Sequence, residues 1–86
     1  MDTLTKNEGL ITKIIGPVID IEFQQGDLPE IYTALHIYKE DGSYIVAEVQ
    51  QMLGSNKVRA VAMASTDGLK RGMKVINTNE PIKIPV

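Results

Sequence analysis

The 86-residue sequence contains no cysteine and a single histidine, His36. Without cysteine the chain has no thiolate metal ligand, no disulfide framework and no thiol nucleophile. No apolar run approaches the roughly 20 residues that a membrane-spanning helix needs. The polar N-terminal residues 1–8 lack the hydrophobic region of a secretion signal. We therefore expect a chain with no direct membrane insertion.

Charge of one sign is also scarce. Nine Lys and Arg residues face eleven Asp and Glu residues, for a formal net charge of −2. This weak acidity provides no electrostatic reason to bind nucleic acid or an anionic membrane. One Phe and three Tyr residues do not predict the stacking platform of a single-strand binder. The length and the ordinary globular composition predict one domain with a thin core.

Short β-branched runs, separated by turns that contain Gly, Pro or Asp-Gly, make up most of the chain. Nowhere do apolar residues keep a helical spacing over three turns. The pattern predicts strands over residues 9–15, 18–23, 34–38, 44–53, 57–63 and 73–77. Several short strands at close spacing predict an all-β barrel or sandwich, and closure into a barrel is favoured because it removes exposed edges.

Alternation within the strands assigns their faces. In residues 18–23 it directs Ile19, Ile21 and Phe23 to the core, and Asp20 and Glu22 to water. In residues 34–38, Leu35 and Ile37 share one face.

The connections between the strands can also be predicted. Asp41-Gly42 suits a hairpin turn, Gly54-Ser55-Asn56 a second turn, and residues 79–81 a third. Ile31-Tyr32 is expected to fold over one barrel end, and residues 82–86 to begin an extended exit. Met52, Met63 and Met73 are expected to fill gaps in the core.

The stretch 58–78 is rich in hydroxyls, charges and glycines, yet it predicts a hairpin-like corner with its turn at Asp67-Gly68. Either Val61 and Met63, or else Ala60 and Ala62, should face the core. Ser65, Thr66 and Asp67 are typical of a turn in which side chains bond the local backbone. The only basic cluster, at Lys70, Arg71 and Lys74, indicates a rim of mixed charge rather than a nucleic-acid patch.

None of the residue combinations in the sequence predicts catalysis, cofactor binding or a metal site. Asp20 and Glu22 could be imagined as an acid–base pair, but polar-out alternation accounts for both. His36 has no cluster of metal ligands around it. Gly68 and Gly72 do not fit a phosphate loop, and the chain contains no Gly-Lys pair. We expect no catalytic, cofactor-binding or metal-binding residues here.

An ordered set of segments covers nearly the whole chain from Gly9 onward. The segments are IIGPVIDIEF at 14–23, LPEIYTAL at 28–35, EVQQMLG at 48–54, VRAVAMASTDGLKRGMKVI at 58–76 and PIKIPV at 81–86. This set resembles the N-terminal β-barrel domain of the beta subunit of F-type ATP synthase. The wording at 48–51 and 58–63 is more similar to plastid or cyanobacterial versions than to mitochondrial ones.

The resemblance implies a closed six-stranded Greek-key-like barrel over residues 9–86, after a lead-in at 1–8. It implies that the barrel joins neighbouring alpha-subunit barrels in a crown that holds the alternating hexamer together. The F1 complex would sit peripherally on a plastid thylakoid or bacterial membrane, or on the mitochondrial inner membrane. ATP or ADP and Mg²⁺ would bind only in the full-length subunit, which carries out proton-driven ATP synthesis.

A barrel in a ring meets its neighbours through two different surfaces, because ring contacts are heterologous. Candidate subunit-interface residues are outward positions of the strands and turns: Asp20, Glu22, Arg59, Asp67 and Arg71. The alternative function is a free-standing nucleic-acid-binding barrel of the OB or SH3-like kind. That class often carries basic and aromatic faces, and neither is evident in this sequence.

Overall fold

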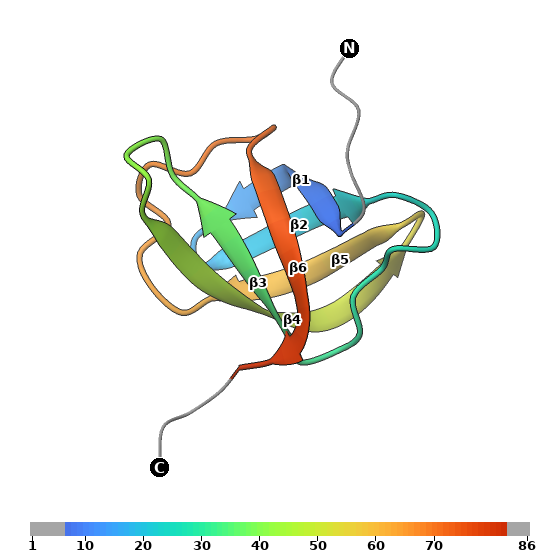
Figure 1. Ribbon diagram of the computed structural model, residues 1–86. Helices are drawn as coiled ribbons and strands as arrows, with labels where there is room; N and C mark the ends of the chain where they lie inside the picture. The colour runs from blue at the N-terminus through green and yellow to red at the C-terminus, as the bar shows by residue number, and fades with distance from the viewer. Residues whose placement is uncertain (1–6, 83–86) are drawn as a thin grey trace.

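Six strands and their connecting turns make up the computed structural model, which describes residues 7–82. The strands are β1 (Glu8–Ile15), β2 (Val18–Phe23), β3 (Thr33–Tyr38), β4 (Tyr44–Gly54), β5 (Lys57–Ala62) and β6 (Lys74–Pro81). All pairings are antiparallel, and the strands close into a barrel in the order β1-β2-β5-β4-β3-β6 (Figure 1). The expected all-β, closed six-stranded barrel is confirmed.

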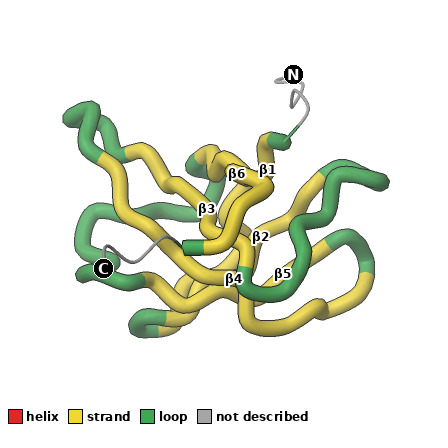
Figure 2. Tube along the Cα trace, turned by 60° about the horizontal axis from the view of Figure 1, so that its bottom comes forward, coloured by secondary structure: helices red, strands yellow, loops and turns green. Residues whose placement is uncertain are grey.

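The connectivity is that of a Greek key. Consecutive strands β3, β4 and β5 pair in turn, and β6 then returns to lie beside β3. Figure 2 shows the loops gathered at the ends of the barrel wall. The strand order corrects the expected hairpin-like corner at residues 58–78, because β5 pairs with β2 and β4 whereas β6 pairs with β3 and β1.

The segment between β5 and β6 crosses the end of the barrel instead of reversing as a hairpin. Leu69 lies within the hydrophobic core at 9% exposure. The Thr66 hydroxyl donates to the Gly16 carbonyl oxygen at 3.0 Å, and the Gly72 N–H donates to the Ile11 oxygen at 2.8 Å. Burial of Leu69 and these ties to β1 and its turn hold the segment, residues 63–73, over one end of the core.

The core confirms most of the expected strand faces. Ile19 and Ile21 are fully buried, and Phe23 is 2% exposed. Of the two alternatives for β5, Ala60 and Ala62 face the core. The other buried apolar side chains come from all the remaining strands and include Ile11, Leu35, Ile37, Ile45, Ala47, Val49, Val58 and Val75. One side of every strand therefore contributes to a single core.

Two of the predicted turns have the expected form. In the β3–β4 hairpin, the Lys39 N–H donates to the Ser43 oxygen at 2.8 Å, and Gly42 has a φ of 91°. The Asp41 carboxylate accepts hydrogen bonds from the N–H and the hydroxyl of Ser43. The β4–β5 turn places Ser55 and Asn56 at positive φ, as a tight hairpin turn requires.

Three expectations about smaller elements are wrong. Met52 and Met63 are 41% and 53% exposed, because they lie where β4 and β5 leave the core, and of the three methionines only Met73 packs against it. Ile31 and Tyr32 do not cover the barrel end. The Tyr32 N–H bonds the Val49 oxygen at 2.7 Å, and this backbone tie leaves the Tyr32 side chain 60% exposed.

The expected turn at residues 79–81 is also wrong, since β6 continues to Pro81 and pairs there with Thr33. A register shift in the β3–β6 pairing and the positive φ of Asn79 accommodate the irregular residues without ending the strand. The expected lead-in at 1–8 falls almost entirely outside the described residues, although Glu8 already belongs to β1. The expected exit at 82–86 lies outside them beyond Ile82.

Candidate interface site

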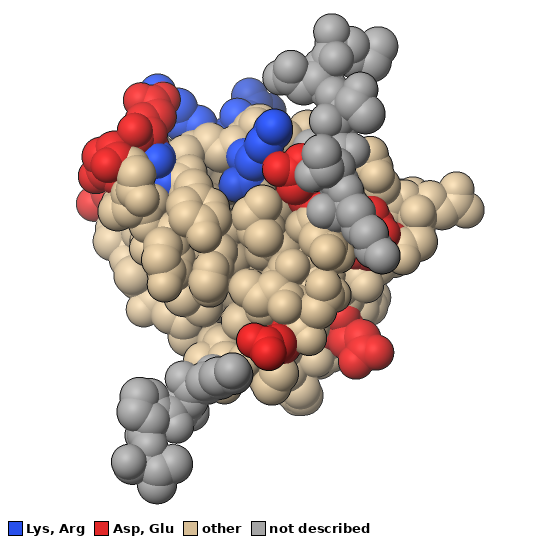
Figure 3. Space-filling view, viewed as in Figure 1, with Lys and Arg blue, Asp and Glu red and all other residues tan. Residues whose placement is uncertain are grey.

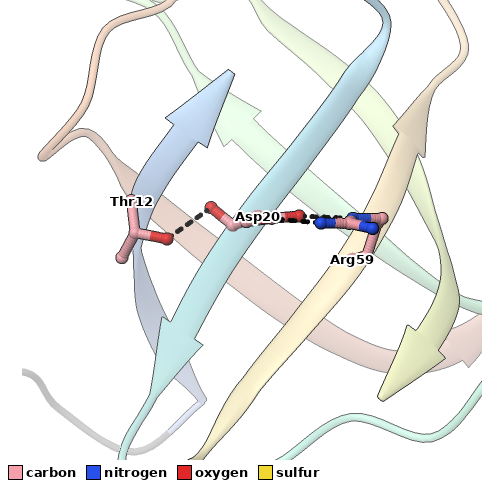
Figure 4. A network of polar contacts seen from close by, with 3 residues as sticks. All are labelled: Thr12, Asp20 and Arg59. Atoms are coloured by element: carbon pink, nitrogen blue, oxygen red, sulfur yellow. Dashed lines mark hydrogen bonds and ion pairs between the residues drawn. The ribbon is translucent and has the colours of Figure 1, made fainter. Parts of the chain in front are cut away.

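The most specific polar contact on the barrel wall joins β2 and β5. Asp20 and Arg59 are directly opposite each other in the β2–β5 register. Arg59 Nε donates to Asp20 Oδ1 at 2.9 Å, and Arg59 Nη2 donates to Asp20 Oδ2 at 3.1 Å (Figure 4). On the other side, the Thr12 hydroxyl donates to the Asp20 backbone oxygen at 3.2 Å. The contacts thus link three neighbouring strands, β1, β2 and β5.

The surroundings of Asp20 correct the expectation that its side chain meets water. Asp20 is only 8% exposed, although its strand neighbours Ile19 and Ile21 face the core. The guanidinium of Arg59 covers the carboxylate from the adjacent strand. Its hydrogen bonds hold the pKa of Asp20 below the usual value, against the opposing effect of burial, and the same contact raises the pKa of Arg59.

A shallow pocket of 260 Å³ adjoins the ion pair. Lys13, Ile15 and Val18 line it together with Asp20 and Arg59. Ile15 is 58% exposed, so the ion pair lies beside an apolar patch on the outer surface. A desolvated bidentate pair next to exposed apolar side chains is an arrangement found at protein contact surfaces.

The other three predicted contact residues do not join this pair. Glu22 is exposed on β2 and faces Lys57 in the β2–β5 register. Asp67 and Arg71 are exposed in the segment at residues 63–73. The Asp67 N–H receives a hydrogen bond from the Ser65 hydroxyl oxygen at 3.2 Å, as expected for a local turn. The five residues therefore form one close pair and three separate surface positions.

The sequence interpretation missed an aromatic cluster on the outer face of β3 and β4. His36 stacks on Tyr44 with ring centroids 4.4 Å apart, and Tyr38 lies 5.4 Å from Tyr44. Tyr38 and Tyr44 are half exposed, at 47% and 50%. The predicted hairpin at Asp41-Gly42 already implied this pairing, because a symmetric count outward from the turn places Tyr38 opposite Tyr44.

Charge around the cluster does not fit a nucleic-acid surface. The adjoining hairpin carries Glu40 and Asp41, and the face over β3 and β6 is largely uncharged, as Figure 3 shows. A single-strand binder combines stacking rings with a basic groove along the backbone path. The nucleic-acid-binding alternative is therefore not favoured, even though three rings do gather.

The described part of the chain holds no group of three or more His, Asp or Glu side chains arranged to bind a metal ion. Between residues 7 and 82, no buried side-chain polar atom lacks a hydrogen-bond partner. Over the same residues there is no helix with the length and hydropathy of a membrane span. The polar groups of the barrel wall are thus engaged in structure.

Fold and surface together define a small Greek-key barrel whose conspicuous features are an inter-strand ion pair and outward apolar and aromatic patches, as in a module that contacts other proteins. Residues 11–79 match the family model described as the ATP synthase alpha/beta family, beta-barrel domain. The chain belongs to the ATP synthase alpha/beta family. Full-length members of this family are ATPases, and membership implies assembly within an alpha/beta hexamer.

Proposed function

We propose that this chain is the N-terminal barrel domain of an ATP synthase beta subunit, and that it acts as a non-catalytic assembly domain. In this role it holds the alternating alpha/beta hexamer together while other parts of the subunits perform proton-driven ATP synthesis. The family match over residues 11–79 carries the proposal. The assignment to beta, rather than alpha, rests on the residue pattern at 14–23 and 58–76.

The strand order supports a role in a ring. In the closed order, β2 and β5 lie on the opposite side of the barrel from β3 and β6. The first side carries the Asp20–Arg59 pair and exposed Ile15, and the second carries the aromatic cluster. Two unlike surfaces on opposite sides are what a heterologous ring contact needs.

In the proposed complex, the neighbours are alpha-subunit barrels, and Glu22, Asp67 and Arg71 remain candidate contacts beside Asp20 and Arg59. The F1 complex is peripheral to its membrane, with a plastid thylakoid or bacterial membrane proposed ahead of the mitochondrial inner membrane. Nucleotide and Mg²⁺ bind in the full-length subunit, outside these residues.

Sedimentation of the chain alone and with purified alpha subunit tests the assembly role. We expect a monomer alone and a faster-sedimenting complex with the alpha subunit. Charge reversal at Glu22 or Arg71 should weaken that complex, whereas Glu40→Lys on the β3–β4 hairpin serves as a matched control. Tight binding of MgATP to these 86 residues in calorimetry, or no association with the alpha subunit, would contradict the proposal.

A further inference from the structure

The second half of β1 has a strand partner on one side only. Its pairing with β2 continues to Ile15, but its pairing with β6 covers Glu8, Gly9 and Leu10 alone. Ile11 is then held by segment 63–73, since its N–H donates to the Met73 oxygen at 3.0 Å. In the described chain, residues 12–15 have no strand on that side. We call these four residues the open edge.

A groove with a volume of 590 Å³ runs along the open edge. All four residues of the open edge line it on one side, and Leu69, Lys70 and Arg71 line it on the other. Lys13, Lys70 and Arg71 are exposed, and no carboxylate lines the groove. The groove is therefore cationic on a chain whose net charge is −2. Figure 3 shows Lys and Arg side chains along this rim of the barrel.

The neighbouring carboxylates leave these cations available. Asp20 is the carboxylate that interacts with Lys13, but it is already bound by both donors of Arg59. Asp67 lines a different depression, on the side of Lys70 that faces the β3–β4 hairpin. Lys13 and Arg71 line no surface in common with Asp67.

An unpaired strand edge accepts an extended peptide, because its free N–H and C=O groups can continue the ladder. We propose that the open edge binds an extended acidic segment of a partner protein, which adds a strand beside β1. Alternate carboxylates of that segment meet Lys13, Lys70 and Arg71, and the intervening apolar side chains contact Ile14, Ile15 and Leu69. This contact goes beyond the proposed ring contacts, because it uses the barrel end.

The observations favour a peptide over a nucleic acid. A phosphate backbone needs cations but makes no use of free main-chain groups, nor of the apolar Ile14, Ile15 and Leu69 that also line the groove. An extended peptide uses all three features at once. The structure thus assigns one class of occupant to this groove, an acidic strand.

The test uses an eight-residue peptide of alternating glutamate and valine, blocked at both ends, titrated into the ¹⁵N-labelled chain. We expect amide shifts at residues 12–15 and 69–71, with slowed hydrogen exchange at the open edge. A peptide of the same sequence with N-methylated valines keeps its charge but cannot pair, and it should bind at least about tenfold more weakly, as expected when several main-chain hydrogen bonds are lost.

A pair of matched variants tests the cations. Lys70→Glu should weaken binding of the glutamate–valine peptide by about fivefold or more, whereas Lys39→Glu, on the hairpin outside the groove, should change it less than twofold. The proposal is overturned if the peptide does not bind at millimolar concentration, or if the methylated peptide binds equally well. It is likewise overturned if a single-stranded oligonucleotide perturbs the same amides more strongly. None of these results depends on association with an alpha subunit.

Discussion

Asp20 on β2 and Arg59 on β5 lie opposite each other in the barrel wall, and the guanidinium donates to both carboxylate oxygens at 2.9 and 3.1 Å. The two residues are unequal in burial, with side-chain exposures of 10% for Asp20 and 38% for Arg59. Loss of either partner therefore leaves the other in a different situation. An unpaired Arg59 can turn to water, but an unpaired Asp20 carboxylate stays in a poorly solvated site.

The first prediction follows from this asymmetry. Asp20→Ala should lower the free energy of unfolding by about 1–2 kcal/mol, the usual cost of losing a hydrogen-bonded charged group. Arg59→Ala should be more destabilising, because it leaves a buried carboxylate without its donor. Urea unfolding of both variants, with Glu22→Ala as an exposed control on the same strand, measures the order. Equal effects of Asp20→Ala and Glu22→Ala would show that the pair contributes nothing specific.

A second prediction concerns pH. The hydrogen bonds from Arg59 hold the pKa of Asp20 below its model value of 3.8. A carboxyl group with a lowered folded pKa stabilises the fold above the unfolded value, and that contribution disappears as the pH falls through the folded pKa. The urea midpoint should therefore fall as the pH is lowered from about 5 to below 3.8, where both states become protonated.

The control for the pH experiment is Asp20→Asn, which should flatten this dependence. It should not abolish it, because hydrogen bonds from Ser43 also lower the pKa of Asp41. Asp20→Asn and Asp41→Asn should thus each remove part of the slope. A slope unchanged in Asp20→Asn would show that the ion pair does not couple stability to pH.

Local patterns in the sequence were sufficient to predict most of the wall. Alternation identified Ile19, Ile21 and Phe23 as core residues, and the turn at Asp41-Gly42 fixed the β3–β4 hairpin, because both depend on neighbours in sequence. The face of β5 stayed open between two alternatives until the pairing with β2 and β4 placed Ala60 inside. Small side chains there carry too little hydrophobic contrast to decide a face.

Features that depend on pairing between distant strands could not be predicted. The burial of Asp20 requires Arg59, which is 39 residues away, and alternation alone assigned Asp20 to water. The crossing of segment 63–73 depends on Leu69 finding the core, which no turn rule describes. The open edge at residues 12–15 exists only because β6 departs from β1 after Leu10. None of these relationships leaves a pattern in a local window.

A third prediction concerns Gly9 on β1, which closes tightly against β2. A Cβ atom at this position would lie 2.8 Å from Phe23 Cε1 and 2.9 Å from the Glu22 backbone oxygen. Because the backbone oxygen cannot move without breaking the ladder, Gly9→Ala should destabilise the chain by about 1–3 kcal/mol. Gly26→Asn is the control: it lies in open space at a positive φ that asparagine tolerates. Thermal unfolding of both variants measures the contrast, and equal midpoints would contradict the steric argument.

The last prediction concerns Leu69, which anchors the crossing segment in the core at 9% exposure. Leu69→Ala removes a core side chain and leaves a void at the barrel end, so it should cost about 2–5 kcal/mol, toward the lower value if the segment settles inward. Leu28→Ala, at a leucine that is 39% exposed, should cost less than about 1 kcal/mol. The same anchor sets one wall of the cationic groove, so Leu69→Ala should also speed amide exchange at Gly72, whose N–H bonds the Ile11 oxygen at 2.8 Å. Destabilisation without faster exchange at Gly72 would show that Leu69 fills the core but does not hold the segment against β1.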